Sequence, residues 1–177
     1  MASVTNPYGP DSAPGLRFEL EVMAVDFHEE WKRCNMVANY VAEYAAYQFP
    51  RRELAENLIS TVLNEMLESS CHLVPQRSML KLTLVENEGF LKIEIEHGLD
   101  IPMLQAYPAF IAGLEQTFSD EEYITLLTTE TNAPVFFNQL GLAMVAHDFK
   151  ATLSFRPAAG SGRSATIVRL PTKELVS

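Results

Sequence analysis

The chain has 177 residues, of which 47% are hydrophobic and 20% are charged, a composition typical of one soluble globular domain. Its 13 Lys and Arg residues against 23 Asp and Glu residues give a formal charge of −10. A surface this acidic repels phosphate backbones and anionic lipids, which argues against nucleic-acid and membrane partners. The two cysteines cannot form a multi-cysteine framework, so we expect reduced, small apolar residues in a cytoplasmic protein without a leader or membrane span.

The first residues are rich in Pro, Gly and Ser, so residues 1–15 are expected to form a flexible tail and residues 16–177 a single domain. Hydrophobic periodicity predicts the elements that follow. Alternation predicts a strand at 18–25, and helical spacing predicts helices at 27–49 and 52–72. Two strands at 79–85 and 90–96 flank a turn, followed by helices at 101–114, 120–128 and 136–149 and strands at 151–155 and 165–170.

The helix at 52–72 organises this prediction, because its apolar residues repeat at the spacing of one helix face. Glu65, Ser69 and His72 lie along one edge of that face, where they could line a pocket. The order of elements indicates an α+β fold, a two-layer sandwich with helices on one face of a mainly antiparallel sheet. We expect its core to contain Leu58, Val62, Met66, Ile93, Ile95, Leu142 and Val145.

Three short stretches, each on or next to a predicted helix or strand, then point to a known family. They are Val62-Leu-Asn-Glu-Met-Leu-Glu-Ser-Ser70 on a helix, Glu96-His-Gly-Leu-Asp-Ile-Pro102 after a strand, and Leu140-Gly-Leu-Ala-Met-Val145 opening a helix. A closing turn, Gly160-Ser-Gly162, precedes the last strand. In this order they resemble the N box and the two glycine boxes of the GHKL ATPase superfamily (gyrase, Hsp90-type chaperones, histidine kinases and MutL proteins). In size the chain resembles the anti-sigma-factor-type serine kinases, and the resemblance implies a histidine-kinase-like (Bergerat) ATPase fold.

The resemblance also implies which residues would serve an ATP site, and several depart from the family pattern. Glu65 matches the position of the catalytic base, whereas Ser69 replaces the asparagine that holds magnesium. Glu96 replaces the aspartate that reads adenine, and Gly98 is retained. Asp100 replaces a glycine beside the nucleotide, which adds a negative charge and a Cβ there. In the second glycine box Gly141 is the only glycine left, so the phosphate cradle is poorer than in the family.

The segment Met103–Phe137 corresponds to the nucleotide lid of that family and is unusually apolar and poor in glycine. Two roles fit this composition: the segment fills the empty nucleotide cavity, or it presents an apolar surface to another protein. We expect a mixture of the two, with Phe110, Leu114 and Tyr123 as exposed anchors, because aromatic residues dominate interface energetics.

These observations favour a regulatory protein-binding module of bacterial signalling with a degenerate nucleotide site, no resident cofactor and another signalling protein as partner. The alternative is an active ATP- and magnesium-dependent serine/threonine protein kinase of the anti-sigma-factor type, with Glu65 as catalytic base and Ser69 as a metal ligand. A structural subunit of a homodimer or larger homo-oligomer is a third option. A divalent-ion site at Glu96, His97 and Asp100 is disfavoured, because one turn supplies too few ligands.

Overall fold

The computed structural model describes residues 15–30, 32–87, 89–99, 103–115, 119–128, 137–159 and 162–176. The elements in chain order are β1 (Arg17–Met23), α1 (Ala24–Glu29), α2 (Lys32–Ala46), α3 (Arg52–Leu73), β2 (Met79–Asn87), β3 (Phe90–His97), α4 (Met103–Glu115), α5 (Asp120–Thr128), α6 (Gln139–Asp148), β4 (Thr152–Arg156), β5 (Ser164–Pro171) and α7 (Thr172–Val176). Apart from Gly15, the expected tail lies outside the described residues.

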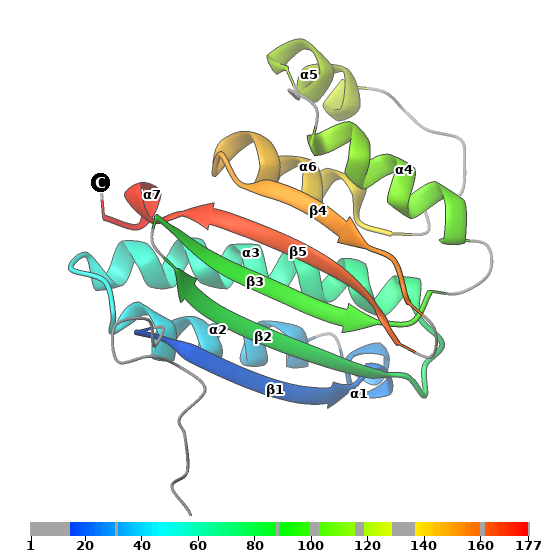
Figure 1. Cartoon of the computed structure of the whole chain (residues 1–177), viewed down its shortest axis with the longest axis horizontal. Helices are drawn as coiled ribbons and strands as arrows, with labels where there is room; N and C mark the ends of the chain where they lie inside the picture. Colours follow the sequence, from blue (N-terminus) through cyan, green and yellow to red (C-terminus); the bar gives the residue numbers. More distant parts are fainter. Residues whose placement is uncertain are drawn as a thin grey trace, which may run out of the picture.

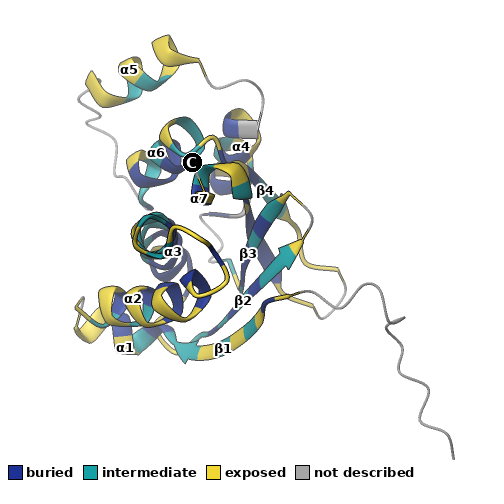
Figure 2. Cartoon of the chain, turned by 90° about the vertical axis from the view of Figure 1, so that its left-hand side faces the viewer, coloured by how far each residue is buried: buried dark blue, intermediate teal, exposed yellow. Residues whose placement is uncertain are grey.

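Within the described residues, five strands form one open sheet in the order β1-β2-β3-β5-β4, and every neighbouring pair is antiparallel. Figure 1 shows this sheet with α2 and α3 running behind it. Seen from the side in Figure 2, the helices lie on one face of the sheet. The predicted α+β class and two-layer arrangement are confirmed.

The core lies between the inner face of the sheet and α3. The inner face carries Leu82, Leu84, Ile93 and Ile95 without exposed surface, because alternate residues of a strand point to the same side. All predicted core residues are fully buried except Leu58, which is partly buried against the core. No helix in the described part of the chain is both long enough and apolar enough to cross a membrane.

The first helical segment differs from its prediction. The strand ends at Met23, where the backbone N–H of Ala24 donates to the carbonyl of Ser78, and the chain turns directly into α1. Ala24 and Phe27 are buried by this turn, so alternation in the sequence extended the predicted strand too far. A second helix, α2, then begins at Lys32.

Side-chain caps mark the starts of α5 and α6. The predicted capping box of α5 is confirmed, because Ser119 and Glu122 each bond to the other's backbone N–H, at 3.2 Å and 2.8 Å. Helix α6 begins at Gln139, later than predicted, because the side chain of Asn138 accepts from the N–H of Gly141 and caps it. The short helix α7 was not predicted, since five residues are too few to show helical periodicity.

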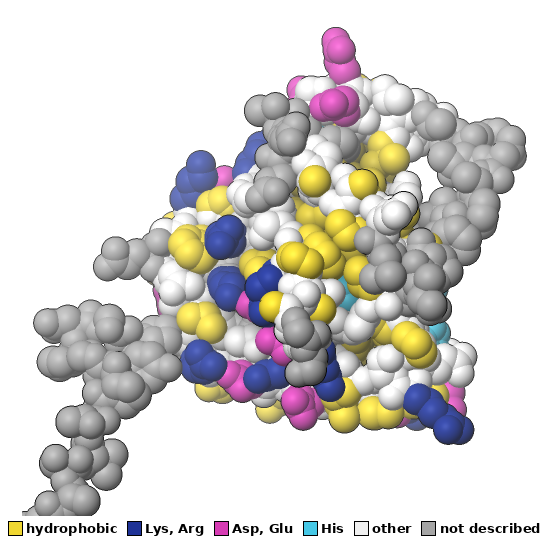
Figure 3. Space-filling view, turned by 45° about the vertical axis from the view of Figure 1, so that its right-hand side comes forward, with side chains coloured by type: hydrophobic (Ala, Val, Ile, Leu, Met, Phe, Trp, Pro, Cys, Tyr) yellow, Lys and Arg dark blue, Asp and Glu magenta, His cyan; other side chains and the backbone are white. Residues whose placement is uncertain are grey.

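The outer face of the sheet carries an ion-pair network centred on Glu94. Lys92 contacts its carboxylate at 2.5 Å, and Arg156 reaches across β5 to bond Glu94 and to approach Glu96 at 3.4 Å. Burial acts to raise the pKa of Glu94, but Lys92 and Arg156 outweigh it and hold the pKa below its usual range. Figure 3 shows Lys and Arg side chains gathered over the sheet, with acidic ones between them.

We predict that Arg156→Ala lowers the free energy of unfolding by about 1 kcal/mol at pH 7, less than the ~1.5–3 kcal/mol of a charged hydrogen bond because Arg156 is half-exposed. Since the folded-state pKa of Glu94 is lowered, this stabilisation is present above pH 4.5 and is lost as the pH falls through the folded pKa. Urea unfolding at several pH values measures the effect. Lys173→Ala, which removes an exposed 4.0 Å ion pair, is the control; a difference independent of pH would contradict the assignment.

Candidate functional site

The polar edge of α3 meets the start of α6, and this junction forms the first half of the candidate site. Glu65 and Glu68 are half-buried, Ser69 is buried, and His72 at the end of the helix is exposed. Glu68 and His72 line a shallow pocket of about 220 Å³ with Phe137 and Asn138. The predicted edge therefore lies beside a pocket at His72, and Glu68 lines the same pocket.

A hydrogen-bonded bridge closes the junction above Glu65. The amide of Asn138 donates to Glu65 Oε2 at 2.6 Å, while its carbonyl oxygen accepts from the N–H of Gly141 at 2.9 Å. A Cβ added at Gly141 would overlap the Glu65 carboxylate and lie 2.5 Å from the Asn138 amide nitrogen. An alanine at position 141 would therefore require the Glu65 carboxylate and the Asn138 amide to move, and the N–H of Gly141 is already engaged by the chain's own cap.

The two carboxyl groups of this junction have pKa values above the usual value for a glutamate. Burial and the neighbouring charge of Glu68 raise the pKa of Glu65, and the hydrogen bond from Asn138 offsets only part of that rise. Burial likewise raises the pKa of Glu68. A half-buried carboxyl group with a raised pKa, held by an amide, has the properties of a general base.

The second half of the site is a buried hydrogen-bond chain that begins at His97, the last residue of β3. Its Nδ1 lies 3.0 Å from the carbonyl oxygen of Gly98, which can only accept, so Nδ1 carries the proton. Burial lowers the pKa of His97, and the ring is neutral at pH 7. Its Nε2 therefore accepts from the hydroxyl of Thr166 at 2.9 Å, and Thr166 accepts from Tyr107 at 2.8 Å.

Four rings surround this chain and form what we call the aromatic cluster: His97, Tyr107, Phe137 and Phe155. The Tyr107 ring lies 5.0 Å from Phe137 and 5.9 Å from Phe155, in edge-to-face arrangements typical of packed aromatic pairs. The His97 ring is 6.1 Å from Tyr107 and 6.4 Å from Phe155. Tyr107 is fully buried, and this burial raises its pKa to about 12. Tyr107 thus anchors α4 to the end of the sheet.

Ser69 joins the two halves of the site. Its hydroxyl is completely buried and close enough to Tyr107 to lower the tyrosine pKa, but it makes no hydrogen bond of normal geometry. The residue expected to replace the magnesium ligand therefore lies under α4. Glu65, four residues earlier on the same helix, lies against Gly141 at the start of α6.

The residues of the first glycine box are not gathered at that junction. Glu96 extends from the outer face of the sheet, where it pairs with Arg156, while His97 points to the inner face. Glu96 and His97 consequently diverge, as alternation along β3 requires. Gly98 is exposed, and Asp100 lies outside the described residues.

The three expected anchors are only partly exposed. Leu114 is 7% exposed and belongs to the core, so its prediction as an exposed anchor is wrong. Phe110 is half-buried with its ring 5.3 Å from that of Phe137. Tyr123 is half-buried and stacks on His147 at 4.2 Å. Among the residues of this segment that the structure describes, the large exposed apolar side chains are instead Ile124 and Leu127 of α5.

The sequence contained weak signals for the residues that were missed. In the alternation of β3, His97 lies on the same side of the strand as the apolar residues Leu91, Ile93 and Ile95, and this position indicated that it is buried. Asn138 precedes an apolar helix at the position of an N-cap, which indicated its cap but not its bond to Glu65. A contact across 73 residues of sequence leaves no local pattern.

No group of three metal-ligating side chains suited to an ion occurs in the described residues. No family model matches the chain, and none of the curated proteins searched matches it either.

We predict that Gly141→Ala lowers the free energy of unfolding by about 1–3 kcal/mol, because the added methyl group meets the Glu65 carboxylate. Alanine normally stabilises a helix relative to glycine by about 1 kcal/mol, so the same change in a Glu65→Ala background should be neutral or stabilising. Chemical denaturation of the two single variants and the double variant measures this coupling. An equal cost in both backgrounds would show that Glu65 is not the obstacle.

Proposed function

We propose that this chain is a regulatory protein-binding module of bacterial signalling, built on a histidine-kinase-like ATPase fold whose nucleotide site is degenerate. One observation carries the proposal: the chain's own side chains fill the inner face of the sheet at the end of β3. Tyr107 of α4 is buried there against Thr166 and within the aromatic cluster. Helix α4, the first part of the segment that resembles a nucleotide lid, thus packs as part of the core.

The polar half of the site supports the same conclusion. A helix N-terminus binds phosphate through free backbone N–H groups. At α6 the N–H of Gly141 is bonded to Asn138, and the Glu65 carboxylate stands directly over the glycine. An ionised carboxylate at that point repels a polyanion, by about 4 kcal/mol for two unit charges ~4 Å apart at an effective dielectric of ~20 before salt screening.

A surface suited to a protein partner lies over α4 and α5. From Met103 to Leu114 the chain has no charged residue, and its exposed positions include Ala106, Ala109 and Ala112. Helix α5 adds Ile124 and Leu127, which are 57% and 50% exposed. The uncharged α4 part has the usual composition of an interface core, and the exposed acidic residues of the first turn of α5, Asp120, Glu121 and Glu122, border it.

The active serine/threonine kinase is retained as a second candidate because of Glu65. Its raised pKa and its hydrogen bond to Asn138 suit a general base that accepts a hydroxyl proton. That role requires Asn138 and Tyr107 to move from the positions described here before ATP and magnesium can enter.

We predict that calorimetric titration with ATP shows no binding tighter than ~1 mM, with or without magnesium. The physical reason is the combination of a filled inner face and a carboxylate over the helix terminus. Glu65→Ala is the comparison: in the proposed module it removes the repulsion without creating tight binding. Micromolar affinity for magnesium-ATP that falls on Glu65→Ala would instead establish the kinase.

We further predict that Ile124→Ser with Leu127→Ser leaves the unfolding free energy within about 1 kcal/mol of the parent, because both side chains are exposed. The same double variant should lose partner proteins recovered by affinity capture and identified by mass spectrometry. Val176→Ser, at a residue 43% exposed on α7, is the control and should recover them. Leu114→Ser should instead destabilise the fold by about 2–4 kcal/mol. Equal recovery by all folded variants would place the partner surface elsewhere.

A further inference from the structure

The opposite edge of the sheet carries a row of large exposed side chains on α2 and on Tyr47, the residue after its last turn, whose ring centroid lies 3.6 Å from the Arg52 guanidinium carbon. Met36, Tyr40, Tyr44 and Tyr47 are 69%, 64%, 50% and 64% exposed. Their spacing of four, four and three residues places them along one side of the helix, which we call the tyrosine row. The opposite side of α2 is buried and consists of small residues such as Cys34, Ala38 and Ala42.

The tyrosine row lies next to an unpaired strand edge. Strand β1 is the last strand of the sheet, and no described strand pairs with its outer edge. The Phe18 and Tyr44 rings are 5.6 Å apart, while Val22 and Val37 line one pocket, so β1 and α2 run side by side in opposite directions. An open strand edge beside an exposed apolar helix face is a surface that pairs readily with another chain.

We propose that this surface pairs with a second copy of the chain through antiparallel β1–β1 contacts and packing between the two tyrosine rows. A two-fold axis at Glu19 places Arg17 of each copy opposite Glu21 of the other, and Phe18 opposite Leu20. An axis at Leu20 would instead oppose Glu19 and Glu21, two carboxylates. At the favoured axis each Glu19 is already paired with its own Arg17 and Lys81, the latter at 3.4 Å.

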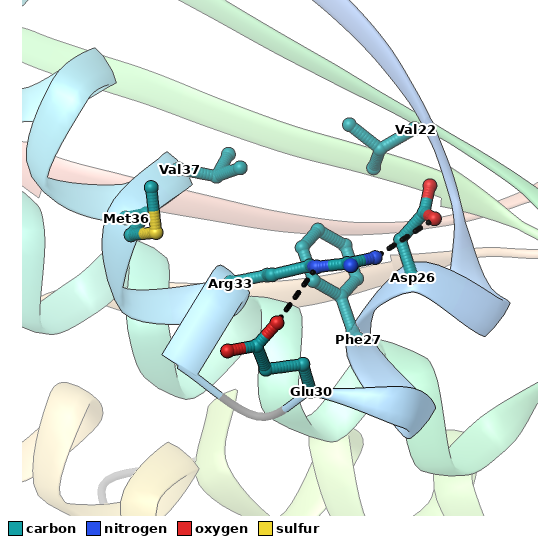
Figure 4. Close-up of a pocket in the computed structure, with 7 residues that line it drawn as sticks. All are labelled: Val22, Asp26, Phe27, Glu30, Arg33, Met36 and Val37. Atoms are coloured by element: carbon teal, nitrogen blue, oxygen red, sulfur yellow. Dashed lines mark hydrogen bonds and ion pairs between the residues drawn. The ribbon is translucent and has the colours of Figure 1, made fainter.

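A pocket beside the tyrosine row fits a ring from the second copy. It has a volume of about 410 Å³ and is lined by Val22, Phe27, Met36 and Val37 together with an ion-paired Arg33. Figure 4 shows Arg33 between Asp26 and Glu30, to which it is ion-paired at 3.2 Å and 3.3 Å. Because β1 and α2 run in opposite directions, the same two-fold axis brings Tyr47 of one copy opposite residues 33–37 of the other.

The area of this surface suits a dimer. At their observed exposure the four side chains of the tyrosine row present roughly 400–500 Å² per chain. The paired strand edge and the pocket extend this toward the ~800 Å² per partner of a standard interface. The charges on β1 restrict which strand can pair, since only an antiparallel partner with matching alternation brings Arg17 and Glu21 together.

The test is the mass of the full chain in solution by sedimentation equilibrium over a range of concentrations. We expect a reversible dimer whose dissociation constant rises at least about 30-fold in Tyr40→Ser with Tyr47→Ser. Ile124→Ser with Leu127→Ser, equally exposed on α5, is the matched control and should leave it within about twofold. Circular dichroism and thermal unfolding establish that each variant is folded.

Charge reversal tests the register independently of the tyrosines. Glu21→Arg places arginines opposite one another and should weaken the dimer, whereas adding Arg17→Glu should restore it. A full chain that stays monomeric overturns the proposal. This holds even if the chain dimerises once residues 1–14 are removed, because the tail would then cover the surface. A dimer indifferent to both the tyrosine and the charge variants also overturns it. Neither outcome bears on nucleotide binding, so the proposed function is tested separately.

Discussion

The packing of α3 against the inner face of the sheet is the constraint on which the other elements depend. Helix α3 contacts α2 on one side, α6 and α7 on the other, and β3 beneath it. Ile59, Val62, Leu63, Met66 and Leu67 have no exposed surface. A helix enclosed on so many sides must satisfy or bury every polar group along its length. The chemistry of the candidate site follows from how Glu65, Glu68 and Ser69 are accommodated.

The chain accommodates these groups by covering them. Asn138 bridges Glu65 to the start of α6, and α4 covers Ser69 with Tyr107. Two hydroxyl groups, those of Ser69 and Ser70, remain buried without a hydrogen bond, a cost that a better-adapted core would avoid. A pocket designed to exchange a ligand would instead leave these groups open to solvent. The closed arrangement therefore supports the proposed role at the surface of the protein.

The fold was predictable from the sequence in those elements whose hydrophobic residues keep one regular spacing from end to end. Helix 52–72 and the strands at 79–85 and 90–96 matched α3, β2 and β3 to within two residues at every boundary, because each has one buried face. The site was less predictable. The bond between Glu65 and Asn138 and the chain from Tyr107 through Thr166 to His97 join residues 59 to 73 positions apart. Such contacts depend on tertiary packing, which single-chain periodicity does not encode. The exposure of Leu114 was misjudged for the same reason, since only the packed position of α4 shows that this residue faces the core.

The two candidate interaction surfaces lie beyond opposite edges of the sheet. The tyrosine row follows β1 at one end of the strand order, while α4 packs on β4 at the other. Pairing through β1 thus leaves the surface of α4 and α5 unobstructed in both copies. A dimer of this kind presents that surface twice, facing outward at the two ends of a continuous sheet. Two linked sites raise the effective affinity for a partner that is itself dimeric, without any new contact. Self-association through one edge would in this way strengthen recognition at the other.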